Sequence, residues 1–367
     1  MQFTIQREAL LKPLQLVAGV VERRQTLPVL SNVLLVVDGN TLSLTGTDLE
    51  VELVGRINLE DGAEAGEITV PARKLMDICK SLPDDATLNV KVDDNKAVIK
   101  AGRSRFTLAT LPAADFPNVE DSPGAMSFAV SQNKLRRLIE RTSFAMAQQD
   151  VRYYLNGMLL EINNGQLRSV ATDGHRMAMC TVDAGIDYQE RYQLIVPRKG
   201  ILELARLLGE ADDLVNITLG SHHIRATTGD FTFTSKLVDG KFPDYERVLP
   251  RGGDKVVLAD RQTLRNAFSR TAILSNEKYR GIRLMLSEGQ LKIQANNPEQ
   301  EEAEEEIVVE YSGASLEIGF NVSYLLDVMN VLGSEHVKMI LADANSSALV
   351  QESENDDCLY VVMPMRL

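Results

Sequence analysis

The residues of this sequence that could do acid–base chemistry stand in one turn, where Asp173 is followed by Gly174 and His175. A carboxylate beside an imidazole is the pairing that many general bases use. Such a base needs a nucleophile or a metal-bound water, but the G-x-S-x-G, H-E-x-x-H, G-x-G-x-x-G and G-x-x-x-x-G-K patterns are all missing. We therefore expect no catalytic residue and no cofactor. A hydrolase or metal enzyme built on Asp173 and His175 is the alternative.

Candidate metal ligands are few and poorly grouped. His222 and His223 are adjacent, so in a strand their side chains would point to opposite faces of the sheet. The Glu-rich run over residues 299–306 is either a cation site or a solvated edge, and its charge density favours the solvated edge. We predict no metal site.

The cysteines Cys79, Cys180 and Cys358 lie far apart without a C-x-x-C pair, which argues against a zinc ribbon or a disulfide framework. We expect reduced thiols, as is usual in the cytoplasm. No apolar run approaches the length of a membrane span, so we expect no membrane partner. These observations predict a cytoplasmic protein.

The turn at Asp173 belongs to the middle copy of a motif that occurs three times. The matched leucines Leu42, Leu167 and Leu291 lie 125 and 124 positions apart, and only the middle copy carries Gly-His-Arg after its turn. A repeat of this length predicts three domains. Linkers rich in Pro, Gly and Asp at 112–117 and 242–253 place them at residues 1–125, 126–253 and 254–367.

Each third holds two copies of a smaller unit, made of a strand, a helix and three strands. Apolar residues recur every three or four positions in the helices and alternate in the strands. The fold class is therefore α+β. The expected helices cover residues 7–17, 72–82, 132–143, 198–209, 261–272 and 322–332.

Charge is distributed unevenly along the chain. The net charge is −13, which by itself argues against nucleic acid, but the six expected helices carry 15 basic and 5 acidic residues. One interpretation is that these are ordinary solvated helix faces. If instead all the helices lie on one side of a continuous sheet, that side is positive and attracts phosphates whatever the net charge. We favour the second interpretation.

Five long motifs resemble the bacterial DNA polymerase III β subunit, the β sliding clamp family. They are Leu-Thr-Gly-Thr-Asp-Leu-Glu at 44–50, Ala-Thr-Asp-Gly-His-Arg at 171–176, Phe-Thr-Ser-Lys-Leu-Val-Asp-Gly at 233–240, Ala-Asn-Asn-Pro-Glu-Gln-Glu-Glu at 295–302, and the C-terminal residues 360–367. The resemblance covers all three thirds. It implies a clamp fold in which two chains of three domains each close head to tail into a six-domain ring.

The resemblance implies a non-catalytic processivity factor that encircles double-stranded DNA without reading its sequence. An ATP-dependent clamp loader places such a ring on DNA near the nucleoid. The polymerase III catalytic subunit, other polymerases and repair proteins then bind through short peptide motifs. A repeat scaffold that binds only proteins is a further alternative.

The resemblance also assigns residues to the DNA and to the ring interface. The residues expected to touch DNA are Arg24, Arg73, Gln149, Tyr153 and Tyr154. Tyr154 could instead pack in the core. The residues expected at the dimer interface are Lys74, Ile78, Phe106, Leu108, Ile273 and Leu274. Of these, Ile273 and Leu274 could equally be core residues. The acidic residues Glu301, Glu302, Glu304 and Glu305 are expected to face Arg103 and Arg105.

Partner peptides are expected in a groove between the second and third domains. Its residues in the second domain are Arg152, Leu155, Thr172, Gly174, His175, Arg176, Met177, Pro243, Arg247 and Val248. The third domain adds Asn321, Tyr324, Ser347, Val361, Met363, Pro364, Met365 and Arg366. The apolar members suit leucine or phenylalanine anchors, and arginine or histidine at the rim suits peptide carbonyls or acidic side chains. Met177 stands where leucine is frequent in the family.

Overall fold

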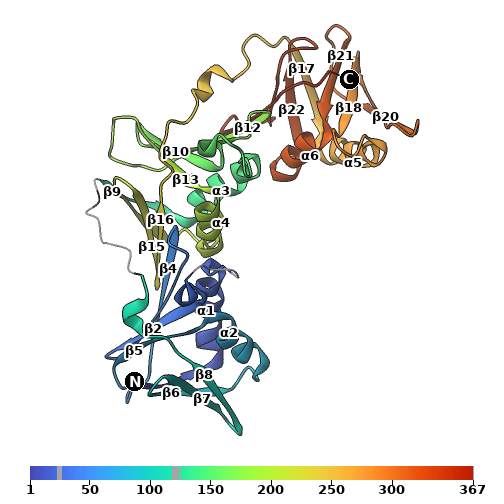
Figure 1. The fold of residues 1–367 in the computed structure, drawn as a ribbon. Coiled ribbons are helices and arrows are strands. Elements are labelled where there is room, and N and C mark those ends of the chain that lie inside the picture. Colours follow the sequence, from blue (N-terminus) through green and yellow to red (C-terminus); the bar gives the residue numbers. More distant parts are fainter. Residues whose placement is uncertain (23–26, 118–123, 125, 367) are drawn as a thin grey trace. The chain divides into compact units, whose positions relative to one another are not determined.

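The computed structural model describes residues 1–22, 27–117, 124 and 126–366. Within them, one order of elements is repeated six times, namely a strand, a helix and three strands (Figure 1). The helices are α1 (Arg7–Val20), α2 (Ala72–Ser81), α3 (Gln132–Thr142), α4 (Arg198–Leu207), α5 (Arg261–Thr271) and α6 (Val322–Val331). The predicted repeating unit and the α+β class are therefore confirmed.

The described chain forms two compact units, and residues 1–133 with 199–237 make the first. Its larger sheet has the order β5-β2-β3-β4-β16-β15-β14-β9, and its smaller sheet has the order β1-β6-β7-β8. The strands are β1 (Gln2–Gln6), β2 (Asn32–Asp38), β3 (Thr41–Thr47), β4 (Val51–Asn58), β5 (Gly66–Pro71), β6 (Thr87–Asp93), β7 (Lys96–Ala101), β8 (Ser104–Ala109), β9 (Met126–Ser131), β14 (Leu214–Leu219), β15 (His223–Thr228) and β16 (Phe231–Lys236).

Residues 134–198 and 238–367 make the second unit. Its larger sheet has the order β13-β10-β11-β12-β24-β23-β22-β17, and its smaller sheet has the order β20-β19-β18-β21. The strands are β10 (Gly157–Asn163), β11 (Gln166–Thr172), β12 (Arg176–Asp183), β13 (Tyr192–Pro197), β17 (Lys255–Asp260), β18 (Gly281–Ser287), β19 (Gln290–Asn296), β20 (Glu302–Val308), β21 (Leu316–Asn321), β22 (His336–Leu341), β23 (Ala348–Glu352) and β24 (Cys358–Val362).

Each larger sheet runs across a boundary between sequence thirds. In the first unit, β4 of the first third pairs antiparallel with β16 of the middle third. In the second unit, β12 of the middle third pairs antiparallel with β24 of the last third, which places Met177 opposite Val361. Backbone hydrogen bonds therefore join the middle third to both of its neighbours.

The helices follow from their apolar spacing and from their first residues. In α2, Leu75 and Cys79 are buried one turn apart, whereas Arg73 and Lys74 are exposed. Asp260 caps α5 by accepting a hydrogen bond from Thr263 N at 2.7 Å. The helix that begins at Arg7 continues to Val20, beyond the predicted end at residue 17, because its last turn still buries an apolar side chain.

The cysteines depart from the sequence expectation. Cys180 and Cys358 are paired residues of β12 and β24, and a disulfide joins them across 178 positions of sequence. The expectation that all three cysteines are reduced thiols was therefore wrong for this pair. Cys79 is a buried free thiol of α2, and burial raises its pKa to about 11. Only the register of the sheet brings the two distant cysteines together.

Candidate functional site in the second unit

The turn between β11 and β12 is held by side chains that bond to its own backbone. Thr172 Oγ1 accepts a hydrogen bond from Gly174 N at 3.1 Å, and Asp173 Oδ1 accepts from the backbone N–H groups of His175 and Arg176 at 2.9 and 3.0 Å. Gly174 has a φ of +88°, which glycine adopts without strain. The Asp173 carboxylate thus holds the turn. It accepts its hydrogen bond from the backbone N–H of His175 and not from the His175 imidazole.

The same turn occurs in the first repeat, over residues 47–51. There too a threonine and an aspartate accept hydrogen bonds from backbone N–H groups, at 2.7 to 3.1 Å. Leu49 takes the left-handed position with a φ of +76°, where the middle copy has Gly174. The first and middle copies of the repeat therefore share this turn. His175 and Arg176 are what the middle copy adds to it.

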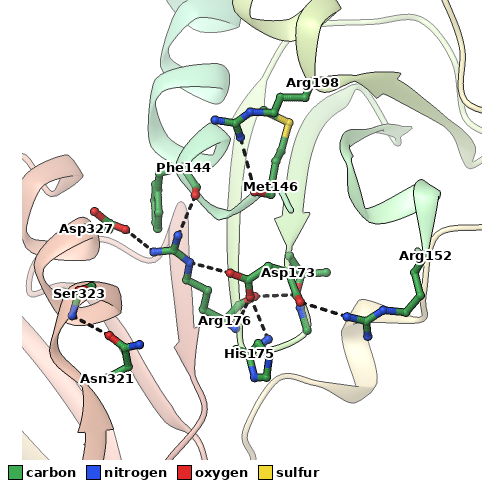
Figure 2. A network of polar contacts seen from close by, with 12 residues as sticks. Phe144, Met146, Arg152, Asp173, His175, Arg176, Arg198, Asn321, Ser323 and Asp327 are labelled. Carbon is green, nitrogen blue, oxygen red and sulfur yellow. Dashed lines mark hydrogen bonds and ion pairs between the residues drawn. The ribbon is translucent and has the colours of Figure 1, made fainter. Parts of the chain in front are cut away.

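The Arg176 guanidinium is occupied by contacts within the chain, as Figure 2 shows. Its Nε donates to Asp173 Oδ2 at 3.1 Å, its Nη2 donates to Phe144 O at 3.0 Å, and its Nη1 is bonded to the Asp327 carboxylate. The guanidinium carbon lies 4.5 Å from the centre of the Tyr324 ring. Only 12% of the side chain is exposed. Arg176 therefore links the turn to the segment that follows α3 and to α6.

His175 is exposed beside the same helix. Its ring stacks with that of Tyr324, with centroids 6.4 Å apart and an angle of 18° between the planes. Burial raises the pKa of the Tyr324 hydroxyl. The backbone carbonyl of His175 accepts a hydrogen bond from Met363 N at 3.0 Å. The start of the C-terminal tail is therefore tied directly to the turn.

An apolar cluster lies beneath these polar residues. Leu155, Met177 and Val361 are buried in it, together with Phe242 and Tyr245. Met363, directly after β24, is 45% exposed. The thioether of Met177 lies among these leucine and valine side chains, and a methionine side chain can adapt its shape to different apolar groups.

Arg152 closes the other side of the turn. Its guanidinium makes a bidentate ion pair with Asp150 at 2.9 and 3.0 Å, and Nη2 also donates to Asp173 O at 3.3 Å. The Arg152 hydrogen bonds lower the pKa of the Asp150 carboxyl to about 2. A cavity of about 340 Å³ lies here, lined by Phe144, Met146, Ala147, Gln148, Asp150, Asp173, His175 and Arg176.

The remaining predicted groove residues take varied positions in the second unit. Pro243, Arg247, Val248 and Arg366 are exposed, and Arg247 pairs with Asp244 at 2.8 Å. Asn321 caps α6 by accepting from Ser323 N at 2.9 Å, as Figure 2 also shows. Thr172, Ser347, Pro364 and Met365 are half-buried. Met365 N donates to Gly319 O at 2.8 Å, so the tail also lies against β21.

Comparisons with known proteins agree over the full length of the chain. Models of the N-terminal, central and C-terminal domains of the DNA polymerase III β subunit match residues 1–120, 129–244 and 246–366. A curated β sliding clamp from Pseudomonas aeruginosa is 78% identical over the whole of both chains, and that of Escherichia coli K12 is 56% identical. The chain belongs to the DNA polymerase III β subunit family. It therefore acts as a sliding clamp in DNA replication.

Solved clamp structures have the same fold. A crystal structure of the P. aeruginosa DNA polymerase III subunit β, 78% identical, superposes with a TM-score of 0.97 over all of both chains. A Caulobacter crescentus β sliding clamp, crystallised with polyethylene glycol at its proposed β-motif tethering region, is 41% identical and has a TM-score of 0.94 over 100% of this chain and 99% of that one. The clamp fold implied by the sequence is confirmed.

Four of the five residues expected to touch DNA lie within the described part of the chain. Arg24 lies outside the described residues, whereas Arg73 is exposed on α2. Gln149 and Tyr153 are exposed in the loop before β10, and Gln149 has a φ of +55°. Tyr154 packs partly against the apolar cluster of the second unit, which was the alternative considered from the sequence.

Residues expected at the clamp's ring interface lie on the edge strand β8, on α2 and in the short turn 272–274 that follows α5. In the described chain, β8 is the last strand of its sheet, with Arg105 exposed, Phe106 half-buried and Leu108 buried. At α2, Lys74 is exposed and Ile78 is half-buried. In the second unit, β20 ends its own sheet, and the side chain of Ile273 is 75% exposed beside half-buried Leu274. Of the glutamates expected to face another chain, Glu304 pairs with Lys292 and Glu305 with Arg270.

Two residues that shape this region were missed by sequence reasoning. Asn156 closes the loop before β10, since its Oδ1 accepts from Asp150 N at 3.0 Å and its Nδ2 donates to Asp150 O at 2.9 Å. Asp327, on α6, holds Arg176 from 151 positions away. Asn156 is a polar residue directly before an apolar strand-like run, and this position could have marked it. The only sequence signal for Asp327 was that it is the single charged residue of the expected helix 322–332.

Two further observations concern the described part of the clamp. No three His, Cys, Asp or Glu side chains there gather in a way that could hold a metal ion. None of the helices found there is long and apolar enough to cross a membrane.

Proposed function

We propose that this clamp is a non-catalytic ring of two chains that encircles duplex DNA and recruits partners through peptides. The observation that carries the ring is a pair of complementary sheet edges. Within the described residues, β8 presents exposed Arg105 and β20 presents exposed Glu302 and Glu304, each at the end of its sheet. Strands with open edges and opposite charge suit pairing between chains.

A head-to-tail contact that closes after two copies gives a six-domain ring. Twelve helices about 10 Å across, standing side by side, would enclose a hole roughly 28 Å wide. Exposed helical residues such as Arg73, Lys74 and Lys80 would make that hole attractive to phosphates. We propose domain boundaries near residues 125 and 253, with DNA contacts at Arg24, Arg73, Gln149, Tyr153 and Tyr154.

The ring predicts retention of the protein on closed circular DNA after loading and loss from the same DNA once it is cut. A clamp loader and ATP would be needed to place the ring on the DNA. We expect the protein in the cytoplasm next to the nucleoid. Gel filtration of the loaded circles measures the retention. Equal loss from cut and closed DNA would exclude a topological ring, and retention on closed circles would exclude a scaffold that binds only proteins.

Partner peptides would bind over the apolar cluster beside the turn at residues 172–176. Leu155, Met177 and Val361 would form the floor, and Met363 would cover an apolar anchor from the exposed edge. Such a pocket fits a leucine or phenylalanine side chain, while His175 at the rim can bind peptide carbonyls. The polymerase III catalytic subunit, the clamp loader, other polymerases and repair proteins are the partners that we propose.

Met363→Ala tests this groove. Removing an exposed apolar side chain from a peptide pocket should weaken a fluorescein-labelled peptide with adjacent leucine and phenylalanine by about tenfold or more. Fluorescence anisotropy measures the affinity, and sedimentation checks that the dimer is unchanged. Val256→Ala, a 40% exposed residue of β17, is the matched control. Unchanged peptide affinity in Met363→Ala would show that the groove is misplaced.

A further inference from the structure

The Arg176 side chain is held mainly by contacts within the chain, and only 12% of it is exposed. Three of its nitrogens are bonded to Asp173, Phe144 O and Asp327, and its guanidinium carbon lies 5.2 and 4.5 Å from the centres of the Phe144 and Tyr324 rings. A guanidinium has five N–H donors, and these contacts use three of them. Arg176 therefore acts within the fold, although its sequence position placed it on the groove rim.

Asp327 and Tyr324 approach Arg176 from the same helix. They are three positions apart on α6, so their side chains lie on one face. Figure 2 shows the Asp327 carboxylate directed at the Arg176 guanidinium from α6, while the turn holds Arg176 from the opposite side. The Asp327 side chain is 41% exposed, so it can be changed without opening the core.

His175 depends on the same contacts. Its ring stacks on Tyr324, whose own ring lies over Arg176. A shift of α6 relative to the turn would therefore move the Tyr324 ring away from His175. The carboxylate of Asp327 opposes that shift, because it bonds a guanidinium that is anchored at Asp173 and Phe144.

We propose that Asp327 is a positioning residue for partner-peptide binding. It holds α6 against the turn through Arg176, and Tyr324 then fixes the orientation of His175 on the groove wall. This inference rests on the proposed peptide groove and adds a residue that need not touch the peptide. The negative charge of Asp327 is the property that this role requires.

The test is the affinity of the labelled leucine–phenylalanine peptide for full-length variants, measured by anisotropy. Asp327→Asn should weaken binding about three- to tenfold, the range expected for a half-exposed ion pair that couples two elements. Asp327→Glu keeps the charge and should bind within about twofold of the parent protein. Asp357→Asn removes another ion pair of the second unit, with Arg137 at 3.3 Å, and should also stay within about twofold.

A double-mutant cycle separates positioning from general weakening. Arg176→Gln together with Asp327→Asn should lose no more affinity than the worse single variant, because both remove one link. Parent-like affinity in Asp327→Asn overturns the inference, as does an equal loss in Asp327→Glu or Asp357→Asn, or full additivity in the cycle. If Met363→Ala binds like the parent, the groove itself fails. If Met363→Ala loses binding and Asp327→Asn does not, only the role of Asp327 fails.

Discussion

Replacing Ile273 and Leu274 by alanine should convert the proposed ring into folded monomers. The side chain of Ile273 is 75% exposed in the single chain. Fully burying an isoleucine is worth about 1.5–3 kcal/mol, so covering its exposed part at an interface is worth about 1–2 kcal/mol. A head-to-tail dimer has two such interfaces, which raises the loss to about 2–4 kcal/mol. That corresponds to a dissociation constant about 30- to 1000-fold weaker.

Sedimentation velocity over a dilution series measures this dissociation constant directly. Circular dichroism melting checks that the variant is folded, since Leu274 is half-buried and contributes to the chain's own packing. Val256→Ala, in the same unit but on β17, controls for loss of an exposed apolar side chain. A double variant that dimerises like the parent protein would refute an interface at these residues. Monomers produced equally by Val256→Ala would refute its specificity.

Two further predictions concern titratable groups. One thiol should react with a maleimide in denatured, unreduced protein and three after reduction, because Cys180 and Cys358 form a disulfide. In the native protein at pH 8, Cys79 should react slowly, since burial raises its pKa to about 11 and keeps it protonated. Three thiols that react fast in the native protein would contradict this prediction. The Asp150 carboxyl should titrate near pH 2 by NMR, so the stabilisation from its Arg152 pair is complete above about pH 4 and lost as pH falls toward 2. In Arg152→Ala that midpoint should rise toward the usual aspartate value, and an unchanged midpoint would contradict the assigned cause.

The repeating fold could be predicted from the sequence because its signals are local. Helix periodicity, strand alternation and the cap at Asp260 each depend on residues only a few positions apart. The ends of helices were less certain, as the extension of α1 to Val20 shows, since tertiary burial decides whether a last turn stays helical.

Contacts between distant residues could not be predicted in the same way. The Cys180–Cys358 pair depends on the register of β12 against β24, which no pattern within either segment specifies. The contacts of Arg176 within the chain could not be foreseen for a related reason. An arginine after a turn is usually exposed, but Asp327 approaches it from another third of the chain.

The residues of the proposed groove come from the family resemblance, and the structure adds their contacts within the chain. The sequence treated His175 and Arg176 alike, as rim groups available to a peptide. The structure separates them, because His175 is exposed while Arg176 is bonded on three sides. Side-chain orientation made the difference, and two neighbouring residues in one turn carry no signal of it.

The sharing of sheets has a consequence for how the chain can be divided into fragments. The middle third completes one sheet through β16 and another through β12. A fragment cut at the linkers would leave both strands with unsatisfied backbone groups along an open edge, which favours aggregation. Proteolytic nicks at the linkers should therefore leave the pieces associated. The boundaries of the two compact units do not coincide with those of the repeat, so we expect cuts within the repeat linkers to divide neither unit cleanly.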